Sequence, residues 1–250
     1  MFRPPVAFAA TVAVLVTAFP AAAADAPPKA LRTMVYQIAY STATLRHEQT
    51  SGFTSTPQGT MGSVAGSGAV DRRFTTDQPG SVTFAVIAAT ADGGLVVDSS
   101  YDGRDVSHPP VRVAIFKTGG LSFDPRTPLG PAEIGLLPYL SRGFIADRTV
   151  APGETWTTQQ LQPTSGATTY RITHVENERA TLQIDGSITL SGPAGYDEHQ
   201  LGTAVYATDV LAPVSLDLYA HIHRQLNSDE ADTTDAHLVA TLVRDSFAKH

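Results

Sequence analysis

The sequence contains no cysteine. No disulfide can brace the fold, so its stability must come from a packed core and from hydrogen-bonded strands. A lipid anchor attached through cysteine is excluded for the same reason. The sequence also lacks an Asn-x-Ser/Thr acceptor for N-glycosylation.

Basic residues are few as well: 17 Lys and Arg stand against 24 Asp and Glu, for a formal net charge of −7. A nucleic-acid backbone attracts a surplus of Lys and Arg, so this balance argues against a nucleic-acid partner. The Gly- and Ser-rich stretch 47–68 contains neither Gly-x-Ser-x-Gly nor Gly-x-Gly-x-x-Gly. A nucleophile elbow and a phosphate loop are therefore unsupported, and we predict no cofactor. We expect this stretch to form a loop or a weakly specified pair of strands.

A long apolar run occurs at the start of the chain. Arg3 supplies a positive charge, residues 6–19 are mostly apolar, and an alanine run follows. This order predicts a secretory signal peptide over residues 1–24, cleaved after Ala24 or one or two residues earlier. The run is shorter than the roughly 20 apolar residues that span a bilayer, although an uncleaved anchor is the alternative. We expect a periplasmic or extracellular protein with one domain over residues 25–250 and no membrane span after cleavage.

Apolar and polar residues alternate through most of that domain, which is the period of a strand with one buried face. Residues 31–45 show the pattern, and residues 81–101 predict a hairpin that turns near Gly93. Residues 130–142 have helical spacing instead, and Pro138 should bend or shorten that helix. The predicted fold class is all-β: a single curved antiparallel sheet or open half-barrel with one short helix.

Part of the chain resembles a known group of proteins. The run Val150–Trp156, then Thr169–Ile172 and Ala180–Ile184 before Gly186, looks like uncharacterised secreted bacterial β proteins. These are similar in plan to half-barrel lipoprotein carriers, in which a long curved sheet wraps a helical plug. The resemblance covers residues 150–208 and implies a concave apolar face for a lipid tail or hydrophobic segment. It supplies no catalytic residue.

The clearest alternation lies in a C-terminal meander formed by residues 201–208, 214–224 and 236–247. In its middle run the even-numbered residues Leu216, Leu218, Ala220 and Ile222 are apolar, and the odd-numbered residues from Ser215 to His223 are polar. The even-numbered face should therefore be the concave one. We predict that a hydrophobic ligand is bound by residues of this face and of the first strand: Tyr36, Tyr40, Tyr206, Leu216, Leu218, Ile222, Leu238 and Leu242.

The opposite face of the same meander carries histidines. A turn centred near Glu230 would place His223 opposite His237, with His221 one pair further along. The same register would place Ile222 opposite Leu238, Ala220 opposite Ala240 and Leu218 opposite Leu242. Three imidazoles, with Asp217 or Asp235, could then bind one metal ion, as in a catalytic zinc site. The alternative is an ordinary solvated face of an amphipathic hairpin.

Two further clusters of ionisable residues are expected to be solvated turns, because Asp and Gly favour turns in their own right. They consist of Asp98, Asp102, Asp105 and His108, and of Asp197, Glu198 and His199.

Three functions are compatible with these patterns. The first is an exported carrier that binds a lipid or another hydrophobic ligand on its concave face. The second is a metal-dependent hydrolase that uses His221, His223 and His237. The third is a structural or assembly module with a filled core.

Overall fold

The computed structural model describes residues 30–53, 65–141, 149–160, 165–190 and 195–247. The predicted signal peptide lies outside these residues. Their elements, in chain order, are β1 (Arg32–Phe53), β2 (Ala65–Ala89), β3 (Leu95–Gly103), β4 (Ser107–Ile115), β5 (Leu121–Ser122), α1 (Pro131–Leu136), the 3₁₀ helix η1 (Leu137–Leu140), β6 (Thr155–Gln160), β7 (Ser165–Glu176), β8 (Arg179–Leu190), β9 (Tyr196–Ala207), β10 (Ala212–Gln225) and β11 (Glu230–Asp245).

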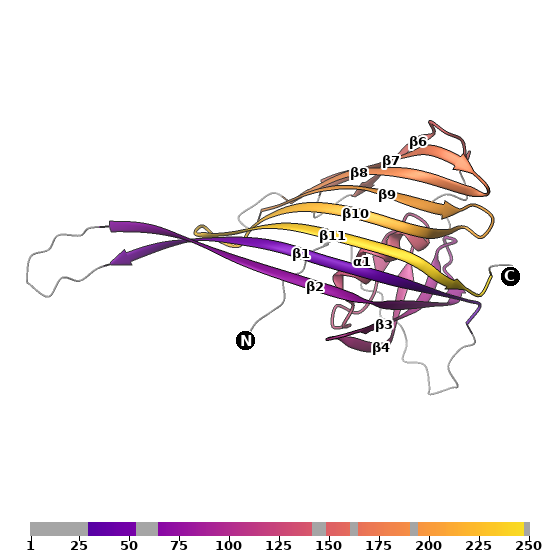
Figure 1. The fold of residues 1–250 in the computed structure, drawn as a ribbon, viewed down its shortest axis with the longest axis horizontal. Helices are drawn as coiled ribbons and strands as arrows, with labels where there is room; N and C mark the ends of the chain where they lie inside the picture. Colours follow the sequence, from indigo (N-terminus) through magenta and orange to yellow (C-terminus); the bar gives the residue numbers. More distant parts are fainter. Residues whose placement is uncertain (1–29, 54–64, 142–148, 161–164, 191–194, 248–250) are drawn as a thin grey trace, which may run out of the picture.

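All the strands belong to one antiparallel sheet of 11 strands, in the order β5-β4-β3-β2-β1-β11-β10-β9-β8-β7-β6. The sheet is curved but not closed into a barrel (Figure 1). Two meanders, β1 to β5 and β6 to β11, therefore meet where β1 pairs with β11. The predicted fold class is confirmed.

Strand alternation sets which side chains enter the core. On β10 the even-numbered residues Leu216 to Ile222 are buried and the odd-numbered residues Tyr219 to His223 are exposed. The face assignment made from the sequence is therefore correct.

The predicted turn at Gly93 is also present. Its φ of 89° is a conformation that glycine adopts at little cost.

The first hairpin is longer than the sequence predicts. β1 and β2 stay paired from Arg32–Val86 out to Phe53–Ala65, whereas β1 pairs with β11 only as far as Glu48. The two strands project beyond the sheet as a two-stranded ribbon (Figure 1). Residues 47–68 were expected to form a loop or a weakly specified pair of strands, and their described parts, 47–53 and 65–68, are paired strands. Residues 54–64 lie outside the described part of the chain.

A short helical segment lies against the concave face, between the β10–β11–β1 region and β3–β4 (Figure 1). Pro131 occupies the first turn of α1, and the segment tightens to a 3₁₀ helix at Leu137–Leu140, around Pro138. Proline lacks the N–H that a continued α-helix needs, so the predicted shortening is confirmed. No helix in the described ranges is long and apolar enough to cross a membrane.

Candidate functional site

The predicted ligand-binding residues gather on the concave face. Seven of the eight are buried in the core, and Leu242 is partly buried against it. The hydroxyls of Tyr36 and Tyr206 are hydrogen-bonded within this core. The Tyr36 hydroxyl donates to the Pro213 carbonyl at 2.9 Å, and the Tyr206 hydroxyl donates to the Tyr139 carbonyl in η1 at 2.6 Å. Burial raises the pKa of both phenols, so both hydroxyls are protonated donors at neutral pH.

The concave face changes from apolar to polar along the strands. We use the word row for the side chains of this face that lie side by side on paired strands. The rows through Tyr36, Ile38 and Tyr40 are apolar, and the next row has short side chains: Thr42 on β1 pairs with Ala236, which pairs with Ala220 on β10. We call this the small-residue row. Beyond it Thr44 pairs with Thr234, and their hydroxyls share a hydrogen bond of 2.9 Å. The face therefore grades from apolar to polar over a few residues.

The gradient ends in the charged row, which runs from β2 to β9 through Arg72, Arg46, Asp232, Arg224 and Tyr196. The Arg46 guanidinium donates two hydrogen bonds to the Asp232 carboxylate, at 2.7 and 3.0 Å, and Arg224 donates one at 3.3 Å. Burial alone would raise the pKa of Asp232, but the bonds from Arg46 and Arg224 outweigh it and hold that pKa below its usual value. Asp232 is thus an ionised carboxylate shared by two arginines.

Glu198 lies on the concave side of β9, level with Thr44 and Thr234. Only 2% of its surface is exposed, and it accepts a hydrogen bond from the Tyr196 hydroxyl. Burial raises the pKa of Glu198 to about 7, although the Tyr196 bond acts in the opposite direction. The polar end of the face therefore contains one carboxyl that changes charge near neutral pH. The expectation that Glu198 is solvated is wrong.

A second buried polar cluster joins the helix to the sheet. Glu133 of α1 accepts hydrogen bonds from the Ser99 hydroxyl and from the His108 ring, the latter at 2.7 Å, and from the Gly130 N–H at 2.9 Å. Ser99 and His108 both bind Glu133, so this is not the serine–histidine contact that activates a nucleophile. We assign the cluster to anchoring of the helix. The expectation that His108 is solvated is wrong.

The histidines of the outer face are not brought together. β10 and β11 pair as Leu218–Leu238 and Leu216–Ala240, which contradicts the predicted pairs of Leu218 with Leu242, Ala220 with Ala240 and Ile222 with Leu238. The turn centre lies near residue 228 instead of Glu230, because Gln225 pairs with Ala231.

Each histidine consequently has its own neighbour. His221 bonds Asp235 at 2.7 Å, His223 lies opposite Thr233, and His237 bonds Asp217 at 2.9 Å and stacks on Tyr219. His237 pairs with Tyr219, which lies four residues from His223 on β10. Four residues span roughly 13 Å along a strand. No group of three or more His, Cys, Asp or Glu in the described ranges could hold a metal ion. The predicted cluster of His221, His223 and His237 is therefore wrong.

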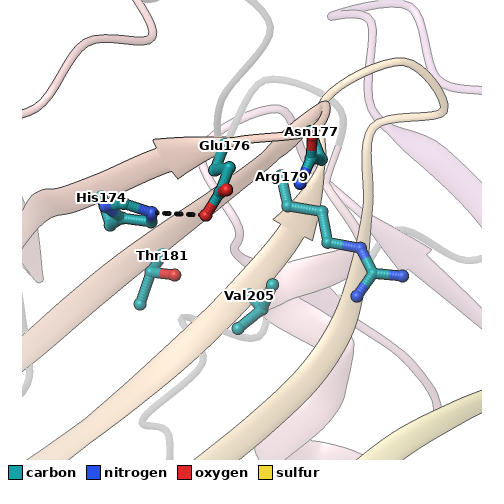
Figure 2. Close-up of a pocket in the computed structure, with 6 residues that line it drawn as sticks. All are labelled: His174, Glu176, Asn177, Arg179, Thr181 and Val205. Atoms are coloured by element: carbon teal, nitrogen blue, oxygen red, sulfur yellow. Dashed lines mark hydrogen bonds and ion pairs between the residues drawn. The ribbon is translucent and has the colours of Figure 1, made fainter.

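A shallow depression lies on the outer side, where the β7–β8 hairpin turns. His174, Glu176, Asn177, Arg179, Thr181 and Val205 line it (Figure 2). His174 bonds Glu176 at 3.1 Å, and both side chains are about two-thirds exposed. An open polar surface of this kind provides no desolvated site for a ligand.

Sequence reasoning missed the residues of the charged row and Glu198. The sequence does indicate the face on which these residues lie. They are even-numbered, like the buried apolar residues beside them: Arg46, Glu198, Arg224 and Asp232. Their convergence depends on the register between four strands, which no local pattern encodes.

Comparison of the chain with protein-family models, with curated proteins and with solved structures found no match.

Proposed function

We propose that the protein is an exported carrier that binds an amphiphile, a molecule with an apolar tail and a polar head, on its concave face. The observation that supports this most directly is the gradient of that face, from apolar rows through the small-residue row to the charged row. An amphiphile has the same order of character along its length. Its tail would gain the hydrophobic free energy of burial, and its head would stay among polar groups.

The tail is assigned to the small-residue row. The helix covers the neighbouring apolar rows: Tyr139 of η1 has its ring centroid 6.4 Å from that of Tyr170, on the row of Tyr40. Ala220 and Ala236 carry short side chains and are each 3% exposed, so a tail bound against them would be shielded from water. The tail enters from the charged end, where Arg46 and Arg224 are about one-third exposed.

The test is saturable binding of a fluorescent fatty-acid or lipid probe to the purified protein. Ala220→Phe should place a ring where the tail is proposed to lie and weaken binding at least tenfold. Ala39→Phe adds the same ring on the exposed, convex side of β1 and should leave binding unchanged. Melting temperatures of both variants establish that each is folded.

Two results would contradict the proposal. One is the absence of saturable binding to the unmodified protein, which would favour the structural module with a filled core. The other is equal binding by Ala220→Phe and Ala39→Phe. The metal-dependent hydrolase is not supported, because the three histidines that it requires lie apart.

A further inference from the structure

The two arginines that hold Asp232 share one carboxylate. Asp232 Oδ1 accepts from Arg46 Nε, and Oδ2 accepts from Arg46 Nη2 and Arg224 Nη2. Arg46 thus uses its planar fork on Asp232, whereas Arg224 makes one long contact of 3.3 Å. Within the described ranges, the Nε and Nη1 groups of Arg224 make no hydrogen bond.

The other carboxylates near this row have other partners. Glu48 pairs with Arg72 at 3.4 Å, and Glu198 accepts from the Tyr196 hydroxyl. The Glu230 side chain accepts from the Asn227 amide at 3.0 Å in the β10–β11 turn. The pKa of Arg46 is raised mainly by its hydrogen bonds to Asp232, and the charges of Glu230 and Glu48 raise it by smaller amounts. At hydrogen-bonding distance, two guanidinium groups therefore face a single carboxylate.

The surroundings of the two arginines favour a bound oxyanion. Asp232 is buried and fixes the Arg46 guanidinium plane through two hydrogen bonds, so little entropy of that side chain remains to be lost on binding. The centroid of the Phe74 ring lies 5.8 Å from the Arg46 guanidinium carbon, within the range of a cation–π interaction. Guanidinium groups bind carboxylate and phosphate through paired N–H donors.

We propose that the amphiphile is anionic and that its carboxylate or phosphate head binds at Arg224 and Arg46, beside Asp232. This inference rests on the proposed function, and it names the chemistry of the head group. The tail then lies along the strands over Thr44 and Thr234 toward the small-residue row, which is the direction in which the concave face becomes apolar.

The test compares four single-chain amphiphiles with the same 12-carbon tail as competitors of a fluorescent apolar probe. Two are anionic (dodecanoate and dodecyl phosphate), one is cationic (dodecyltrimethylammonium) and one is neutral (dodecyl maltoside). The anionic pair should displace the probe at concentrations at least tenfold lower than the other two. Sedimentation with vesicles of anionic phospholipid tests the other source of phosphate, a membrane surface.

Variants at Arg224 identify the group responsible. Arg224→Gln should abolish the preference for anionic heads and leave the affinity for dodecyl maltoside unchanged. Arg224→Lys keeps the charge but not the planar donor pair, and should retain part of the preference. Arg171→Gln, at an exposed position of β7, is the matched control and should behave like the unmodified protein.

The outcomes separate the two proposals. Equal displacement by all four amphiphiles, or an equal loss for all four in Arg224→Gln, would overturn the anionic assignment and leave the carrier function standing. Binding to anionic vesicles but to no dissolved amphiphile would overturn it too. Failure of every probe to bind would remove the carrier function itself.

Discussion

Glu198 is a buried carboxyl whose charge should make the stability of the fold depend on pH. Its pKa is about 7 in the folded chain, against an ordinary value of 4.5. The folded state holds the proton more tightly than the unfolded state, so this contribution to stability is complete below pH 4.5. It is lost as pH rises through 7, and the difference is on the order of 3 kcal/mol.

Glu198→Gln should therefore raise the melting temperature at pH 8 and change it little at pH 4.5. The amide can still accept the Tyr196 hydroxyl hydrogen bond, but it never becomes charged. Glu178→Gln at the exposed β7–β8 turn is the control. Thermal unfolding across this pH range is the measurement, and parallel curves for the unmodified protein and Glu198→Gln would contradict the prediction.

Leu218 and His221 test the two faces of β10. Leu218 is fully buried, and truncation to Ala should cost about 2–5 kcal/mol of unfolding free energy through lost burial and a residual cavity. His221→Ala removes only an exposed pair with Asp235 and should cost less than about 1 kcal/mol. Urea denaturation gives both values, and a greater loss for His221→Ala would show that the faces are misassigned.

For the strands β10 and β11, the sequence predicted which face each side chain lies on but not which residues pair across the two strands. The sequence placed the β10–β11 turn near Glu230, whereas Asn227 forms it: its side chain accepts from the Asp229 N–H and donates to Glu230. Moving the centre of a turn by two residues shifts every pair by four positions. An even shift leaves each side chain on the same face, which is why the buried residues were right although their partners were wrong.

The helix was predictable for a similar reason, and its anchoring was not. Pro131 and Pro138 mark its start and its tightening within a single stretch of sequence. Glu133, Ser99 and His108 come from three separate elements, and only the folded sheet brings them together. The same holds for the charged row, where Arg46 and Asp232 are far apart in the chain.

The Glu133 cluster makes a prediction for the element that it anchors. Glu133→Ala should destabilise the protein by about 3–5 kcal/mol, because it leaves the Ser99 hydroxyl and His108 Nε2 buried without their acceptor. Chemical denaturation measures the loss, and Glu178→Ala is the exposed control. A loss below about 1 kcal/mol would show that Glu133 does not anchor the helix.

For the whole molecule, the pairing of β1 with β11 decides whether the two meanders form one sheet. This contact runs from Met34–Asp245 to Glu48–Glu230, and Arg32–Asp245 and Arg46–Asp232 ion pairs lie at its two ends. Strands adjacent in the sheet are here nearly the whole chain apart. Folding must therefore close a very large loop before this contact forms, and slow folding is expected.

Deletion of residues 226–250 removes β11 from the middle of the sheet instead of from an edge. β1 and β10 would then each present an unpaired edge, and the buried faces of Tyr36, Ile38 and Leu218 would lose the neighbouring side chains of Leu238 and Ala240. We expect this truncation to yield no folded monomer, because long unpaired apolar strands aggregate. The full-length chain, which keeps β11, is the reference. Size-exclusion chromatography and circular dichroism compare the two, and a folded monomer without β11 would show that the meanders are stable independently of their shared contact.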